Sequence, residues 1–155
     1  MINISTYLKI KDNFININDY NGLLKDTFYI EGAIELSIYN IKVIDIEMWD
    51  YVDQLWSYLI EALVKINKNQ EAKINFPDQP IEMKFQPINE NVLITINANE
   101  SRKSFIKKDL LIRTMALHAQ GFFNKLTTFK GIILNDYAID FQNIENLLKD
   151  NEYKP

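Results

Sequence analysis

The stretch that decides the fold is MWDYVDQLWSYLIEALVKI, residues 48–66. Its apolar side chains recur at steps of three and four residues, which places them in one stripe along an α-helix. Asp45 can cap this helix, and Glu47 and Asp50 fall in or near its first turn, where exposed backbone amides favour negative charge. Trp49 and Trp56 return to nearly the same helix face and are predicted to be core residues. The full predicted stripe is Met48, Val52, Leu55, Trp56, Leu59, Leu63 and Ile66.

Segments with alternating apolar and polar residues surround this helix, as is typical of β-strands. Before the helix they are residues 2–10, 14–18, 30–38 and 41–44, the last two joined by a short turn at Tyr39-Asn40 into a hairpin with one wet face. After the helix they are residues 72–76, 81–86, 91–98 and a short edge strand at 104–106.

Two further helices are predicted near the C-terminal end, at residues 109–126 and 137–148. The order β-β-β-α-β-β-β-α-α favours an α+β fold, in which an antiparallel β-sheet of about six strands carries three helices packed mainly on one face. Because no repeat or flexible linker interrupts the chain, residues 1–155 are predicted to form a single domain.

Composition limits the classes of partner. The chain has 155 residues, 47% of them hydrophobic, and a formal net charge of -4, which gives no overall attraction to nucleic acid or to anionic lipid. We therefore predict a protein partner that is basic, no nucleic acid and no membrane. The start of the chain does not resemble a secretory signal, so a cytoplasmic location is expected.

The sequence offers little machinery for catalysis. It contains no cysteine, one histidine (His118) inside an apolar stripe, and four glycines without a phosphate-binding spacing. Asp50 and Asp53 lie three residues apart on the predicted helix, but no third acidic or histidine ligand follows at helical spacing. We therefore expect no enzyme activity, no catalytic residue, no metal site and no cofactor. A hydrolase that uses Asp50, Asp53 or His118 is the weakest of the alternatives.

Residues 76–85, FPDQPIEMKF, contain an acidic turn between two prolines. Pro77 and Asp78 suit the second and third positions of a type I turn, and Pro80 fits the start of the next strand. Asp78 and Gln79 are then predicted to lie at an exposed loop tip. The turn is interpreted mainly as a connection between strands, and a role as a contact surface is the alternative.

The polar face of the central helix allows two interpretations. Asp50, Gln54, Ser57 and Glu61 are predicted to point away from the apolar stripe, with Tyr51 and Tyr58 along one edge. Tyrosine beside acidic residues is typical of interfaces. It is also typical of a solvated helix face, so both interpretations stay open.

Charge is distributed unevenly along the chain. Residues 26–62 contain eight acidic residues against Lys42 alone, whereas residues 101–130 contain seven basic residues against Asp109. The two segments either pack together and partly neutralise each other, or leave an acidic surface that steers a basic partner.

Three motifs carry a resemblance to a known family. They are W-D-x-V-D-x-L-W-x-Y at residues 49–58, the hairpin YIEGAIELSIYN at residues 29–40 and F-P-D-Q-P at residues 76–80. Over about residues 28–126 the chain resembles a family of small bacterial α+β proteins associated with polymorphic-toxin loci. The resemblance implies an immunity protein that binds and blocks a cognate toxin, such as a nuclease.

The resulting hypothesis is a cytoplasmic immunity protein that occludes a basic toxin. The predicted partner-binding residues are Glu31, Glu35, Asp50, Gln54, Tyr58, Glu61 and Asp78. The alternative is a non-enzymatic accessory or homo-oligomerising domain, in which the same face or an uncovered strand edge such as residues 2–10 pairs with a second copy.

Overall fold

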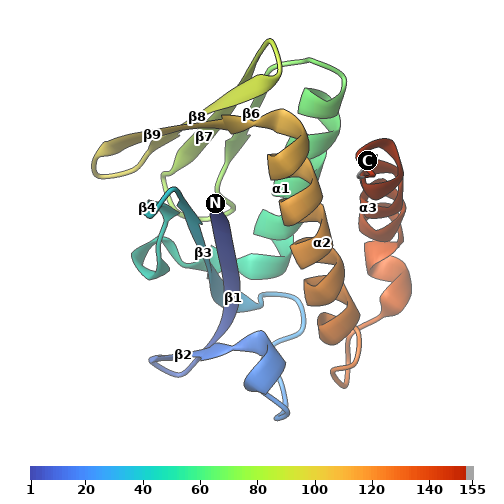
Figure 1. The fold of residues 1–155 in the computed structure, drawn as a ribbon. Helices are drawn as coiled ribbons and strands as arrows, with labels where there is room; N and C mark the ends of the chain where they lie inside the picture. Colours follow the sequence, from blue (N-terminus) through green and yellow to red (C-terminus); the bar gives the residue numbers. More distant parts are fainter. Residues whose placement is uncertain (153–155) are drawn as a thin grey trace.

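Nine strands form two antiparallel sheets in the structure, a computed structural model that describes residues 1–152 (Figure 1). The first sheet has the order β2-β1-β3-β4, and the short strand β5 also pairs with β3. The second sheet has the order β6-β7-β8-β9. The α+β class is therefore confirmed, but the strands divide into two sheets instead of forming one sheet of about six strands.

Most element bounds agree closely with the predicted segments, but residues 17–18 lie in a 3-10 turn and the edge strand predicted at 104–106 extends over residues 101–107. The first sheet contains β1 (Ile2–Ile10), β2 (Asn13–Asn16), β3 (Glu31–Ile38), β4 (Ile41–Ile44) and β5 (Asp50–Tyr51). The second contains β6 (Ala72–Asn75), β7 (Glu82–Ile88), β8 (Asn91–Asn97) and β9 (Ser101–Lys107). The helices are α1 (Val52–Asn67), α2 (Lys108–Leu126) and α3 (Ala138–Asp150), with 3-10 turns at Ile17–Asp19, Ile46–Met48 and Leu134–Tyr137.

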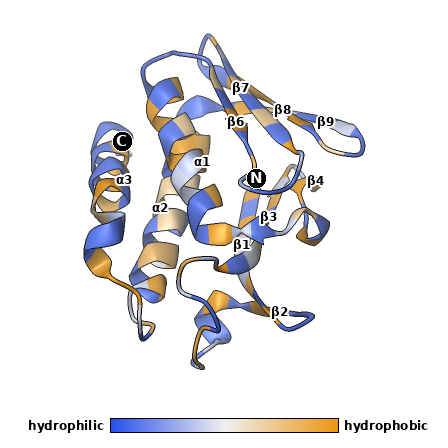
Figure 2. Cartoon of the chain, turned by 180° about the vertical axis from the view of Figure 1, so that it is seen from behind, coloured by the Kyte–Doolittle hydropathy of each residue, from blue (hydrophilic) through white to orange (hydrophobic). Residues whose placement is uncertain are grey.

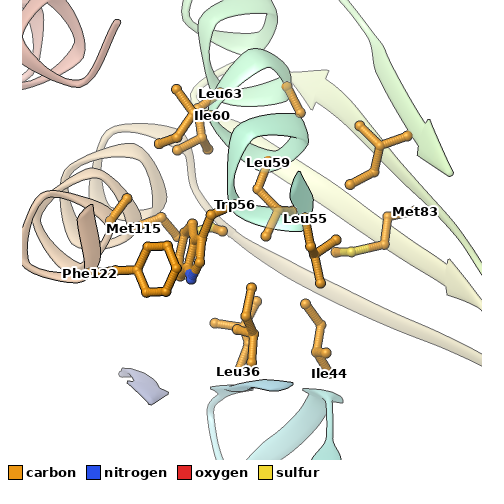
Figure 3. Close-up of a cluster of buried hydrophobic side chains, with 14 of the residues drawn as sticks. Leu36, Ile44, Leu55, Trp56, Leu59, Ile60, Leu63, Met83, Met115 and Phe122 are labelled. Carbon is orange, nitrogen blue, oxygen red and sulfur yellow. The ribbon is translucent and has the colours of Figure 1, made fainter. Parts of the chain in front are cut away.

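The core lies between α1, α2 and the inner faces of both sheets. Trp56 of α1 is fully buried, and Figure 3 shows its ring beside Phe122 of α2, with Leu36 of the first sheet below it. Met83 reaches Leu55 of α1 from the second sheet (Figure 3). Each such side chain contributes about 1.5–3 kcal/mol when it leaves water, so α1 is the element on which both sheets assemble.

The central helix begins later than its periodicity predicts. Asp45 caps the 3-10 turn Ile46–Met48 by accepting from the Glu47 amide at 3.0 Å, and α1 itself starts at Val52. Between them, β5 pairs Asp50 with Gly32 of β3. The helical spacing at residues 48–51 is therefore fortuitous, and Trp49 is half-buried instead of belonging to the core.

Gly32 permits this close approach of chain segments. A Cβ atom at position 32 would fall against the carbonyl oxygen of Tyr7 and 2.9 Å from Val52 Cγ1. The Val52 amide, at the start of α1, donates to the Ile30 carbonyl oxygen at 2.8 Å. A residue without a side chain thus lets the helix start directly on the sheet.

Strand β1 is only in part the open edge proposed for self-association. It pairs with β3 from Ile2 to Leu8 and with β2 from Tyr7 to Ile10. On the β2 side, residues 2–6 have no strand partner. The homo-oligomer hypothesis therefore keeps this part of the strand edge and loses residues 7–10.

α3 packs against both α2 and α1 at the edge of the molecule (Figures 1 and 2). Ile144 and Leu147 are its buried side chains, and Figure 2 shows hydrophilic residues over much of this helix. At its C-terminal end, the Asn67 amide group donates to Asp150 at 3.0 Å and the Asn151 amide group donates to Asn67 at 3.0 Å. Phe141 and Leu148 also pack partly against the core, so α3 is held by apolar contacts along one face and by polar contacts at its C-terminal end.

Two polar connections join the sheets to each other. The first is the carboxylate of Asp50, which accepts from the backbone amides of Asp78 at 3.1 Å and Gln79 at 2.9 Å. The second is Arg102 of β9, which lies 2.9 Å from the Asp45 carboxylate and donates to the Lys42 carbonyl oxygen at 3.2 Å. Arg102–Asp45 is an ion pair between the acidic and basic segments, so those segments do partly neutralise each other.

We expect Asp50→Ala to lower the free energy of unfolding by roughly 2–4 kcal/mol, because buried amides lose a charged acceptor. Urea unfolding measures this change. The matched control is Asp78→Ala, because its exposed side chain can be removed while its backbone amide still donates to Asp50. Equal losses in the two variants would contradict a role for the Asp50 carboxylate as the acceptor.

Candidate protein-binding site

A surface cavity of about 250 Å³ lies where β5 meets the loop between β6 and β7. The Asp50 carboxylate positions this loop, and the Gln79 side-chain amide holds it further by donating to the backbone carbonyl oxygens of Glu47 and Trp49. Hydrogen bonds therefore fix the two segments that form the cavity to each other. The lining residues are Glu31, Glu47, Trp49, Asp50, Tyr51, Asp78 and Gln79.

The cavity carries negative charge at its rim. Glu31, Glu47 and Asp78 are exposed, and within residues 1–152 none of them forms an ion pair. The pKa of the Tyr51 hydroxyl is raised by partial loss of solvent and then by the nearby charges of Asp78 and Glu31. A cation that enters the cavity would meet these carboxylates without first displacing another cation from them.

Aromatic rings flank the carboxylates. The rings of Tyr29 and Tyr51 are 5.2 Å apart, and Tyr29 remains 58% exposed. The Lys9 ammonium lies 4.6 Å from the centroid of the Trp49 ring while it donates to the Lys11 carbonyl oxygen. One face of Trp49 therefore already holds a cation in the folded chain, the type of contact that an aromatic face beside carboxylates favours.

The structure brings together three of the seven predicted partner-binding residues. Glu31, Asp50 and Asp78 line the cavity, and Glu31 lies directly opposite Tyr51 in the β3–β5 pairing. The expectation that Asp50 points outward from a helix is wrong, because Asp50 lies in β5 with 2% of its surface exposed. Its carboxylate lies at the base of the cavity, and Glu31 and Asp78 lie at the rim.

The other four predicted residues lie outside the cavity. Glu35 is engaged within its own hairpin, where it pairs with Lys42 at 3.1 Å and accepts from the Tyr7 hydroxyl at 3.2 Å. The remaining three are on α1, where Gln54 and Tyr58 are half-buried and Glu61 is exposed.

Four lining residues were not among the predicted partner-binding residues, namely Glu47, Trp49, Tyr51 and Gln79. Trp49 was missed because the helical interpretation of residues 48–51 placed it in the core. Two sequence signals pointed to two of the others: Gln79 was predicted at an exposed loop tip, and Tyr51 was predicted along the edge of the polar helix face.

His118 belongs to a separate, buried network. Thr6 Oγ1 lies 2.9 Å from His118 Nε2 and accepts from the Trp56 indole N–H at 3.1 Å. The imidazole stacks on Trp56 with the ring centroids 5.5 Å apart, and burial lowers the pKa of His118. The side chain is thus a neutral packing element that satisfies the buried hydroxyl of Thr6.

Asp53 is the second buried acid, in the first turn of α1. Its Oδ2 accepts from the Tyr137 hydroxyl at 2.8 Å, whereas its Oδ1 has no hydrogen-bond partner within the described part of the chain. Burial raises the pKa of Asp53, and it also raises the pKa of Asp140 on α3. Asp50, Asp53 and His118 therefore bind three different sets of partners and do not assemble the hydrolytic site considered above.

Within residues 1–152, no group of three or more acidic or histidine side chains is placed to hold a metal ion. Over the same residues, no helix is long and apolar enough to cross a membrane. Comparison of the chain with protein-family models, with curated proteins and with solved structures found no match.

We expect Asp53→Asn to gain stability relative to the unmodified protein as the pH rises. The raised pKa of Asp53 means that its protonated form favours folding below the unfolded pKa of about 3.9, and that this advantage disappears as the pH rises through the folded value. Asparagine stays neutral throughout, so the difference in unfolding free energy between the two proteins should grow from acid to neutral pH.

Urea unfolding at a series of pH values measures this difference. The control is Glu90→Gln, which removes an exposed acid at the turn between β7 and β8. A difference for Asp53→Asn that stays constant with pH would contradict the assignment of a buried, destabilised carboxylate.

Proposed function

We propose that the protein acts by binding a basic protein and covering it, with the cavity between β5 and the loop at residues 76–81 as the anchor point. The observation that supports this function best is the combination of carboxylates without ion pairs and aromatic rings around one small cavity. A lysine or arginine side chain of the partner is the group that this chemistry recognises.

The size of the cavity favours a single side chain over a small-molecule ligand. Its volume of about 250 Å³ falls below the range of roughly 300–1,000 Å³ usual for ligand pockets. A guanidinium group suits it particularly well, because it is planar, stacks on aromatic rings and donates in parallel to a carboxylate. Glu31 and Asp78 are positioned as acceptors on the rim, and Trp49 and Tyr51 supply the aromatic walls.

The surroundings of the cavity extend the contact area. Phe28 is 80% exposed and Tyr29 is 58% exposed, and both precede Glu31 along the chain. Large exposed aromatic residues beside an anchoring pocket are typical of the centre of a protein interface. The contact surface that we propose therefore runs from residues 28–31 across β5 to the tip of the loop at residues 78–79.

The nature of the partner rests on the family resemblance. In the proposal, the partner is a bacterial toxin domain with a basic active-site region, and the protein acts as its cytoplasmic immunity protein. Occlusion requires no catalytic group in the protein itself. The net charge of -4 would accelerate encounter with a basic partner, and the anchor would determine how long the complex lasts.

The test is co-expression of the tagged protein with the product of the neighbouring upstream reading frame. We expect a complex that co-purifies, relieves toxicity and weakens as salt is added. The double variant Glu31→Gln/Asp78→Asn should lower the affinity by roughly tenfold or more, because two charge-assisted contacts are lost. Glu90→Gln is the matched control, since it removes one negative charge at an exposed turn away from the cavity.

Two results would contradict this proposal. One is the absence of a complex together with undiminished toxicity. The other is a complex whose affinity is the same for the double variant and the control. Light scattering of the purified protein distinguishes the alternative function, because mass that increases with concentration would indicate a homo-oligomerising domain.

A further inference from the structure

The second sheet has one covered face and one open face. Toward α1 and α2 it presents a continuous apolar layer, with Met83, Phe85 and Ile94 fully buried. The residues that alternate with this layer are exposed or half-buried in all four strands. We call the side formed by these alternating residues the open sheet face.

Basic side chains form a row across the open sheet face. The strand register places Lys73 of β6 opposite Lys84 of β7, Lys84 opposite Thr95 of β8, and Thr95 opposite Lys103 of β9. Neighbouring strands are about 4.8 Å apart, so this row spans about 14 Å. Lys73 and Lys84 lie directly opposite each other, a pairing of like charges that by itself destabilises a sheet.

Two of these lysines are partly neutralised. Lys73 lies 3.2 Å from Glu82, and Lys84 lies 3.2 Å from Glu71. Lys103, and Lys107 four positions further along β9, form no ion pair within residues 1–152. The positive charge of the open sheet face is therefore concentrated on β9.

An exposed aromatic ring lies between the two free lysines. Phe105 projects from the same face of β9 as Lys103 and Lys107, remains 48% exposed and is paired in the sheet with Leu93 of β8. The inner residue beside it, Ile106, supplies the core contact of this part of the strand. Phe105 thus exposes about half of a large apolar side chain to water.

We propose that the open sheet face binds single-stranded nucleic acid. An open sheet whose lysines contact phosphates while an aromatic side chain stacks on a base is an arrangement that suits unpaired strands of any sequence. Phe105 would stack on one base, and Lys103 and Lys107 would neutralise the phosphates on either side of it. The row through Lys84 and Lys73 continues the path across the sheet.

A basic surface can exist on this acidic protein because its positive and negative side chains lie on different parts of the surface. The net charge of -4 led us to predict no nucleic-acid partner, but several of the acidic groups lie around the cavity beside β5. Binding through two free lysines would be weak, fastest to form at low salt and strongly reduced by added salt. The surface is separate from the protein-binding cavity, so this inference does not depend on the proposed function.

The experiment is a fluorescence-anisotropy titration of the full chain with labelled oligothymidylate and oligouridylate at low salt. We expect binding to both. Phe105→Ala should weaken it by about fivefold or more, because base stacking is lost, whereas Phe105→Tyr should retain it. Lys103→Gln/Lys107→Gln should weaken it and reduce the dependence of log affinity on log salt by about 2.

Lys130→Gln is the control, since it removes an exposed positive charge from the loop after α2. All changes are at exposed positions, and circular dichroism with thermal unfolding verifies that each variant folds. Absence of binding at low salt would overturn the proposal, as would equal affinity for the unmodified protein and all variants. Binding of polyglutamate that is as tight as that of the oligonucleotides, and unaffected by Phe105→Ala, would also overturn it in favour of an acidic protein partner.

Discussion

The packing of the two sheets against each other depends on a buried carboxylate, whose oxygen atoms accept hydrogen bonds from backbone amides. Asp50 accepts from Tyr51, Asp78 and Gln79, and so joins a strand of the first sheet to the hairpin loop of the second. A carboxylate that is 2% exposed would be costly without such donors. The same bonds that remove this cost also fix the loop and define the base of the cavity.

Outside this junction the interior is almost entirely apolar. On the surface, negative and positive side chains lie in different regions. The buried polar side chains in residues 1–152 are Thr6, Asp50 and Asp53. Thr6 is satisfied by Trp56 and His118, and Asp50 by amides, whereas Asp53 keeps one oxygen without a partner. Negative charge gathers near β5 and positive charge along β9, so a modest net charge conceals two surfaces of opposite sign.

Most of the fold could be predicted from sequence periodicity, because alternating or three- and four-residue spacing depends on local burial. The strand at residues 2–10 and the helix near residues 109–126 are found almost residue for residue. The prediction failed at residues 48–51, where apolar spacing fits a helix but pairing with β3 imposes an extended backbone. It also placed all strands in one sheet, since local patterns contain no information about which strands pair.

The candidate site could also be predicted only in part. Glu31 and Asp78 were identified as surface acids because charge and turn chemistry can be read locally. The burial of Asp50 could not be predicted from the sequence, because the amides that donate to it are 28 and 29 residues away along the chain. Trp49 and Gln79 were missed for the same reason, since their positions follow from the junction that Asp50 creates.

The position of α3 at the edge of the molecule has a consequence for the native ensemble. This helix fully buries only Ile144 and Leu147 and packs Phe141 and Leu148 partly against the core, whereas α1 buries far more of its side chains, so the release of α3 costs less free energy than the opening of α1. Such an opening would hydrate Asp53 and free it from Tyr137 while the two sheets stay intact. The C-terminal helix is therefore expected to be a separate foldon, and its detachment is the route by which water first reaches a buried charge.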